Sequence, residues 1–178
     1  GEPVVFHDWT LLKACGVRKQ IRELTSAEAS SMLYRASDQH IATFDEALAL
    51  CDSLSLWVML DIKTFEEPPN SERFFQRISE LLEEHGLTQV TITFSGHPLT
   101  RKHLGEKILF AVTREEFEKV QEGDTVSLNR TFWFGLPEDM PSALVPKLQQ
   151  SGALVIPAIN RFRYPAHAHF ELARQDVE

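Results

Sequence analysis

Short apolar runs of β-forming residues alternate with amphipathic helical segments along the whole of this chain. The predicted strands cover residues 4–8, 56–62, 90–94, 108–112, 125–128 and 153–159. The clearest predicted helix is residues 71–84, where Phe74, Phe75, Ile78, Leu81 and Leu82 recur at helical spacing. Strands that alternate with helices of ~10–15 residues indicate parallel pairing and right-handed crossovers. The sequence therefore predicts an α/β fold with six strands.

Three predicted helices begin with the same capping signal, a threonine followed three residues later by a glutamate. The pairs are Thr25 with Glu28, Thr43 with Glu46, and Thr113 with Glu116. They predict helices over residues 26–34, 44–54 and 114–122. Further helices are predicted over residues 99–104, 141–150 and 167–177, whereas residues 10–21 and 129–134 are predicted as loops.

Two architectures fit this order of elements. A doubly wound open sheet accommodates six strands, but the first strand is not followed by a Gly-rich phosphate loop. A (β/α)8 barrel needs about 250 residues, more than the 178 present. The chain begins within a predicted strand and ends within a predicted helix, which is expected of a barrel without its first and last units. The pattern alone does not choose between the two.

Composition limits the kind of partner that this chain can bind. With 43% apolar residues the chain can form one core, and its net charge of -8 argues against a nucleic-acid partner. No apolar run reaches the ~18 residues of a membrane span. Cys15 and Cys51 lie far apart without metal-type spacing, which favours two reduced thiols and a reducing compartment such as the cytoplasm.

Two predicted strands end in groups that can do chemistry. Residues 4–6 are followed by His7 and Asp8, and residues 56–60 are followed by Asp61 and Lys63. The carboxyl ends of parallel strands are where α/β proteins hold their sites. Taken alone, His7 and Asp8 also fit an ordinary turn, and Asp61 and Lys63 also fit a partly buried ion pair.

Several stretches, in order, resemble the glycerophosphodiester phosphodiesterase family. Residues 1–11, GEPVVFHDWTL, resemble its D-G-x-P-V-V-x-H-D-x-T-L motif. Three further motifs of the family are then resembled in order, by IRELT at residues 21–25, IATFDEAL at 41–48 and MLDIK at 59–63. The resemblance is specific over residues 1–63, and two later strands, at residues 91–95 and 155–160, match loosely.

This resemblance implies a (β/α)8 TIM-type barrel, which is incomplete here at about six βα units in a single domain over residues 1–178. It implies metal-dependent hydrolysis of glycerophosphodiesters to glycerol 3-phosphate and an alcohol, in glycerol and lipid metabolism. His7 matches a family histidine that acts as acid or base, and Lys63 matches a lysine at the mouth of the site. Asp61 stands where a metal-binding glutamate is usual, so the implied cofactor is Mg²⁺ or Ca²⁺.

Two departures from the family pattern limit this interpretation. A His-Arg pair and a Glu-x-Asp pair are expected upstream of Gly1 and are not in the sequence, and Asp61 is one methylene shorter than glutamate. We therefore expect the 178-residue chain to be inactive or nearly so by itself. We also expect sheet edges that lack a neighbouring strand to promote self-association.

Three weaker candidates complete the predicted site. Asp8 is expected to orient His7 or the backbone. Trp133 is expected to line a pocket for an alcohol head group, and Asn160 is expected to take part in binding at the end of the last strand. Core packing explains Trp133 equally well. Two other hypotheses stay open: a non-catalytic binding or structural module derived from the barrel, and another phospholipase-type phosphodiesterase of the same fold.

Overall fold

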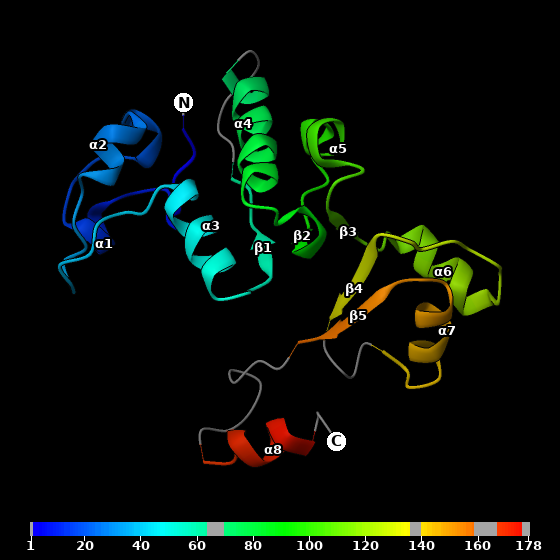
Figure 1. The fold of residues 1–178 in the computed structure, drawn as a ribbon. Helices are drawn as coiled ribbons and strands as arrows, with labels where there is room; N and C mark the ends of the chain where they lie inside the picture. Colours follow the sequence, from blue (N-terminus) through cyan, green and yellow to red (C-terminus); the bar gives the residue numbers. More distant parts are fainter. Residues whose placement is uncertain (1, 64–69, 136–139, 159–166, 176–178) are drawn as a thin grey trace. The chain divides into compact units, whose positions relative to one another are not determined.

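The computed structural model describes residues 2–63, 70–135, 140–158 and 167–175. The chain divides into two compact units, residues 1–108 and residues 109–178 (Figure 1). The elements of the first unit are α1 (Leu12–Cys15), η1 (Ile21–Glu23), α2 (Ser26–Ser30), α3 (Phe44–Ser53), β1 (Val58–Leu60), α4 (Asn70–Glu84), η2 (Thr88–Val90), β2 (Thr91–Thr93) and α5 (Pro98–Leu104). Those of the second are β3 (Leu109–Ala111), α6 (Arg114–Glu122), β4 (Thr131–Gly135), α7 (Leu144–Gln150), β5 (Leu154–Pro157) and α8 (His169–Gln175).

Parallel strands with helical crossovers confirm the predicted α/β class. In the first unit, β1 pairs in parallel with β2, and Met59 lies opposite Ile92. In the second unit, β4 pairs in parallel with β3 on one side and β5 on the other. Each neighbouring pair within a unit follows chain order, as expected where a helix returns the chain to the next parallel strand.

The core of the first unit lies between its strands and α3 and α4. Phe75, Ile78, Leu81 and Leu82 of α4 are buried, which confirms the helical stripe seen in the sequence. Leu48 of α3 and Val58 and Leu60 of β1 are buried as well. These side chains fix one face of β1 against the helices.

The three capping boxes are confirmed. Thr43 Oγ1 accepts a hydrogen bond from the Glu46 N–H at 3.2 Å, and Glu46 Oε2 accepts one from the Thr43 N–H at 2.8 Å. The same reciprocal pair begins α2 at Thr25 and α6 at Thr113. Both bonds satisfy backbone donors that the first turn of a helix cannot pair internally.

The prediction of a buried parallel strand at residues 4–8 is wrong in this structure. Val4 forms one isolated antiparallel bridge with Thr43, and the Val5 N–H donates to the Ala42 carbonyl at 2.9 Å. The Phe44 N–H donates to the Pro3 carbonyl at 2.9 Å. These backbone groups are thus taken by the residues that precede α3, not by the edge of β1.

The chain around residue 130 also differs from the prediction. Residues 124–128 are irregular, and the aromatic stretch that was predicted as a loop forms β4. Thr131, Phe132, Trp133 and Phe134 are all good strand formers. Arg130, at φ 64°, makes the turn that precedes the strand. The structure also adds one helical turn, α1, within residues predicted as a loop.

Among the described residues, no helix is both long enough and apolar enough to span a bilayer.

Replacing Thr43 with Ala removes the side-chain acceptor at the start of α3. We expect a loss of about 1 kcal/mol in the free energy of unfolding, the usual cost of losing such a cap. Urea denaturation followed by circular dichroism measures it. Thr43→Ser keeps the hydroxyl and is the control, so equal destabilisation by both variants would contradict the role of the cap.

Candidate functional site

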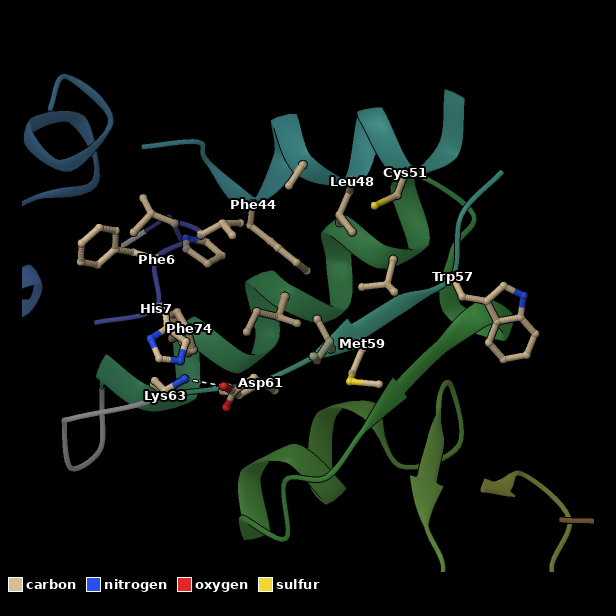
Figure 2. A pocket seen from close by; sticks show the side chains of 18 residues that line it. Phe6, His7, Phe44, Leu48, Cys51, Trp57, Met59, Asp61, Lys63 and Phe74 are labelled. Atoms are coloured by element: carbon tan, nitrogen blue, oxygen red, sulfur yellow. Dashed lines mark hydrogen bonds and ion pairs between the residues drawn. The ribbon is translucent and has the colours of Figure 1, made fainter. Parts of the chain in front are cut away.

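A cavity of about 410 Å³ lies alongside β1 in the first unit, and we name it the β1 cavity (Figure 2). Two stretches of consecutive residues line it, residues 3–7 and residues 57–63. Helices α3 and α4 supply the rest, Phe44, Ala47, Leu48, Cys51, Phe74 and Ile78. His7, Asp61 and Lys63, which are far apart in the sequence, therefore border one space.

The two-residue period of an extended chain places the polar groups of β1. Val58 and Leu60 are buried, whereas Met59 between them is 51% exposed and Trp57 is 52% exposed. Asp61 continues this exposed series just beyond the end of the strand. The face of β1 that does not pack on the helices thus leads from apolar side chains to a carboxylate.

Asp61 and Lys63 form an ion pair at the carboxyl end of β1, drawn as a dashed line in Figure 2. The side chain of Asp61 is 71% exposed and that of Lys63 is 28% exposed. Such an exposed pair contributes little to stability, because water screens it. Both side chains can exchange partners when a charged ligand arrives.

His7 is oriented by its neighbour. The His7 ring is 86% exposed, and its Nδ1 lies 2.8 Å from Asp8 Oδ1. The hydrogen bond from His7 lowers the pKa of the Asp8 carboxyl, and the charges of His7, Lys13 and Lys63 lower it further. Because an ionised carboxylate only accepts hydrogen bonds, the Nδ1 atom that contacts Asp8 carries a proton, and in the singly protonated tautomer Nε2 is the acceptor.

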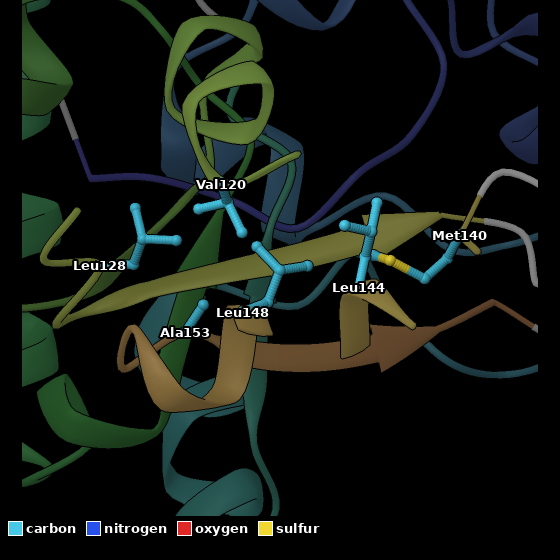
Figure 3. Close-up of a cluster of buried hydrophobic side chains, with 6 residues drawn as sticks. All are labelled: Val120, Leu128, Met140, Leu144, Leu148 and Ala153. Carbon is cyan, nitrogen blue, oxygen red and sulfur yellow. The ribbon is translucent and has the colours of Figure 1, made fainter. Parts of the chain in front are cut away.

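Trp133 is not among the described residues that line this cavity. Trp133 lies on β4 and packs against a buried cluster of the second unit, formed by Val120, Leu128, Met140, Leu144, Leu148 and Ala153 (Figure 3). A Cβ on Gly135 would lie 2.5 Å from the Trp133 ring, so the indole lies against that glycine. Asn160 lies outside the described residues.

The sequence did not indicate the apolar walls of the cavity. Phe74 and Ile78 belong to a helical stripe that predicts core packing, and Trp57 and Met59 belong to a run that predicts a buried strand. The two-residue spacing of residues 57, 59, 61 and 63 is the sequence signal for this wall of the cavity. In an extended chain it places two apolar side chains on the same face as the two charged ones.

The described residues do not by themselves form a metal site. They contain no cluster of three or more His, Cys, Asp or Glu side chains arranged to hold an ion. Asp61 brings one carboxylate, which is already paired with Lys63. Mg²⁺ and Ca²⁺ take six or more oxygen ligands, usually with more than one acid or bound phosphate.

Replacing His7 with Ala should raise the pKa of Asp8 toward its ordinary value of 3.8. The reason is that His7 supplies both the hydrogen bond and the nearest charge that favour the carboxylate. NMR titration of the Asp8 carboxyl carbon measures the change. A folded-state pKa below the ordinary value stabilises the fold above that value, and this contribution is lost as the pH falls through the folded-state pKa.

Glu28 is the internal control for this titration. Its pKa is lowered by the hydrogen bonds of Thr25, so it should titrate identically in both proteins. An unchanged pKa for Asp8 in His7→Ala would contradict the pairing.

Comparison with known proteins gives matches among solved structures. No protein-family model matches the chain, and no curated protein sequence matches it. A glycerophosphodiester phosphodiesterase from Agrobacterium tumefaciens str. C58 matches with a TM-score of 0.64 at 12% identity, over 97% of this chain and 73% of that one.

Two proteins from Parabacteroides distasonis ATCC 8503 also match. One, a glycerophosphoryl diester phosphodiesterase, has a TM-score of 0.64 at 16% identity, over 98% of this chain and 63% of that one. The other, a glycerophosphodiester phosphodiesterase, has a TM-score of 0.58 at 11% identity, over 98% of this chain and 79% of that one. The present chain thus has the fold of an incomplete (β/α)8 TIM-type barrel. It shares this fold with the matched part of these phosphodiesterases.

Proposed function

We propose that this chain carries part of the active site of a phosphodiesterase that hydrolyses glycerophosphodiesters to glycerol 3-phosphate and an alcohol. The observation that carries the proposal is the position of His7, Asp61 and Lys63 on one cavity. These are the residues that match functional positions of the family, and the fold is that of the family's solved structures.

His7 suits the role of general acid or base in this reaction. Water attacks phosphorus, the bond to the departing alcohol oxygen breaks, and one proton has to leave the water while another reaches the alcohol. Imidazole titrates near neutral pH and can do either task. With Nδ1 donating to Asp8, Nε2 is the atom that would accept or return the proton, and Asp8 is a positioning residue.

Lys63 suits a contact to the phosphate. Its ammonium group is a mobile point donor, and its exposed partner Asp61 holds it only weakly. A phosphate oxygen can therefore replace or share the Asp61 contact. The proposal keeps Mg²⁺ or Ca²⁺ as cofactor with Asp61 as one ligand, and further ligands would have to come from outside the described residues.

The second candidate is a non-catalytic binding or structural module. One observation favours it: the described residues that line the β1 cavity include a single histidine and a single carboxylate. A phosphodiesterase of this class needs a second proton-transfer group and more acids. We therefore propose that the 178 residues alone hydrolyse glycerophosphodiesters slowly or not at all.

Hydrolysis of glycerophosphocholine, followed by ³¹P NMR, tests the proposal in the full-length protein and in the 178-residue chain. We expect glycerol 3-phosphate to form with the full-length protein, at a rate that a chelator abolishes. His7→Ala should lower kcat by roughly 10²–10⁴-fold, the usual contribution of general acid–base catalysis.

His40→Ala is the matched control, because His40 lies outside the β1 cavity and should leave the rate within twofold of the parent. A chelator-sensitive rate that His7→Ala leaves unchanged would refute the role given to His7. A full-length protein with no activity would favour the non-catalytic module.

A further inference from the structure

We infer that the chain around α1 is a docking surface for a membrane that contains anionic lipids. This surface comprises residues 9–22 together with Arg35, and we name it the basic segment. The inference concerns an interaction of the first unit and does not depend on the proposed function. It rests on the separation of charge along the chain, on cations without an ion pair, and on exposed apolar side chains among them.

Positive charge is concentrated in the basic segment. Residues 9–22 contain Lys13, Arg18, Lys19 and Arg22 and no acidic residue, in a chain whose net charge is -8. These four residues and Arg35 are all exposed. Cations gathered in this way are attracted to an anionic lipid surface, over a range of about 8–10 Å at physiological salt.

Backbone hydrogen bonds hold the five cations on one short folded stretch. The Leu11 N–H donates to the Lys19 carbonyl at 2.9 Å and closes the loop that contains α1, drawn in blue in Figure 1. The Arg35 N–H donates to the Ala14 carbonyl at 2.8 Å. A Cβ on Gly16 would lie 3.1 Å from the Arg35 side chain, so this side chain lies against the same loop.

The cations of the basic segment form no ion pair with any acid that the structure describes. Glu23 and Glu28, the acids that follow in the sequence, accept hydrogen bonds from the Gln20 N–H at 2.6 Å and the Thr25 N–H at 2.8 Å. Cations elsewhere in the chain do form ion pairs, namely Lys63, Arg77, Lys102, Lys107, Arg114 and Lys119. The charge of the basic segment is therefore left for a partner outside the chain.

Apolar side chains beside these cations favour a lipid bilayer as that partner. Trp9 is 53% exposed and Leu12 is 48% exposed. Indole rings favour the boundary between head groups and hydrocarbon, and a leucine side chain gains free energy when hydrocarbon covers it. A nucleic acid can contact the cations and stack a base on Trp9, but it gains little from Leu12. Cations with a few apolar side chains suit shallow, reversible binding at a membrane surface.

Sedimentation of the 178-residue chain with sucrose-loaded vesicles tests the inference. We expect binding to phosphatidylcholine vesicles with about 30 mol% phosphatidylglycerol, and binding about tenfold weaker or less to pure phosphatidylcholine vesicles. Binding to the anionic vesicles should also weaken at least tenfold in 1 M NaCl, where charges are screened beyond about 3 Å.

Two pairs of substitutions separate the basic segment from the charge of the whole protein. Arg18→Gln with Lys19→Gln should weaken binding to the anionic vesicles about 25-fold, at about fivefold per cation. Arg114→Gln with Lys119→Gln on α6 changes the net charge equally and should leave binding within twofold. Trp9→Ala should weaken binding about tenfold, because the apolar contribution is lost.

Equal binding to the two kinds of vesicle, or equal weakening by the two charge variants, would overturn the inference. Binding of a single-stranded oligonucleotide by a chain that does not bind anionic vesicles would also overturn it, and would assign the cations to a nucleic acid. Circular dichroism checks that each variant is folded. If Arg18→Gln with Lys19→Gln is unfolded, Lys13→Gln with Arg22→Gln takes its place with the same expectation.

Discussion

The parallel pairing of β1 with β2 decides where the candidate site lies. It fixes β1 as an extended chain, so that Val58 and Leu60 face the helices while Met59 faces away from them. The same alternation carries Asp61 to the exposed face beyond the strand end. A shift of one residue in this register would bury Asp61 and expose Leu60, and both changes are costly. Hydrophobic packing against α3 and α4 therefore also positions the charged end of the β1 cavity.

The elements that the sequence predicts well are those with local causes. The capping threonines Thr43 and Thr113 and the apolar stripe of α4 act within one or two helical turns, and the structure has the helices where these signals put them. Residues 3–8 are different, because an extended stretch needs a partner and the sequence does not say which backbone it will pair with. In the structure the partner is the segment before α3. The aromatic stretch at Phe132 is difficult to predict for the same reason, since its composition fits both a loop that lines a pocket and a strand.

The candidate site was predicted through its motif and not through its geometry. His7, Asp61 and Lys63 stood out because they end β-forming stretches that resemble one family. That they border one cavity depends on how residues 3–7 and β1 lie beside α3, which no local pattern encodes. The apolar side of the cavity was missed for the same reason. Trp57 and Met59 are exposed because they lie on the face of β1 opposite to the buried Val58 and Leu60.

We propose that His7, Asp61 and Lys63 act on one ligand in the β1 cavity. Titration of the isotope-labelled 178-residue chain with glycerol 3-phosphate, followed by NMR, tests it most directly. We expect the largest chemical-shift changes at the His7 ring and at the backbone amides of Asp61 and Lys63, with the indole N–H of Trp133 unchanged. Changes at Trp133 without any at His7 and Lys63 would contradict it.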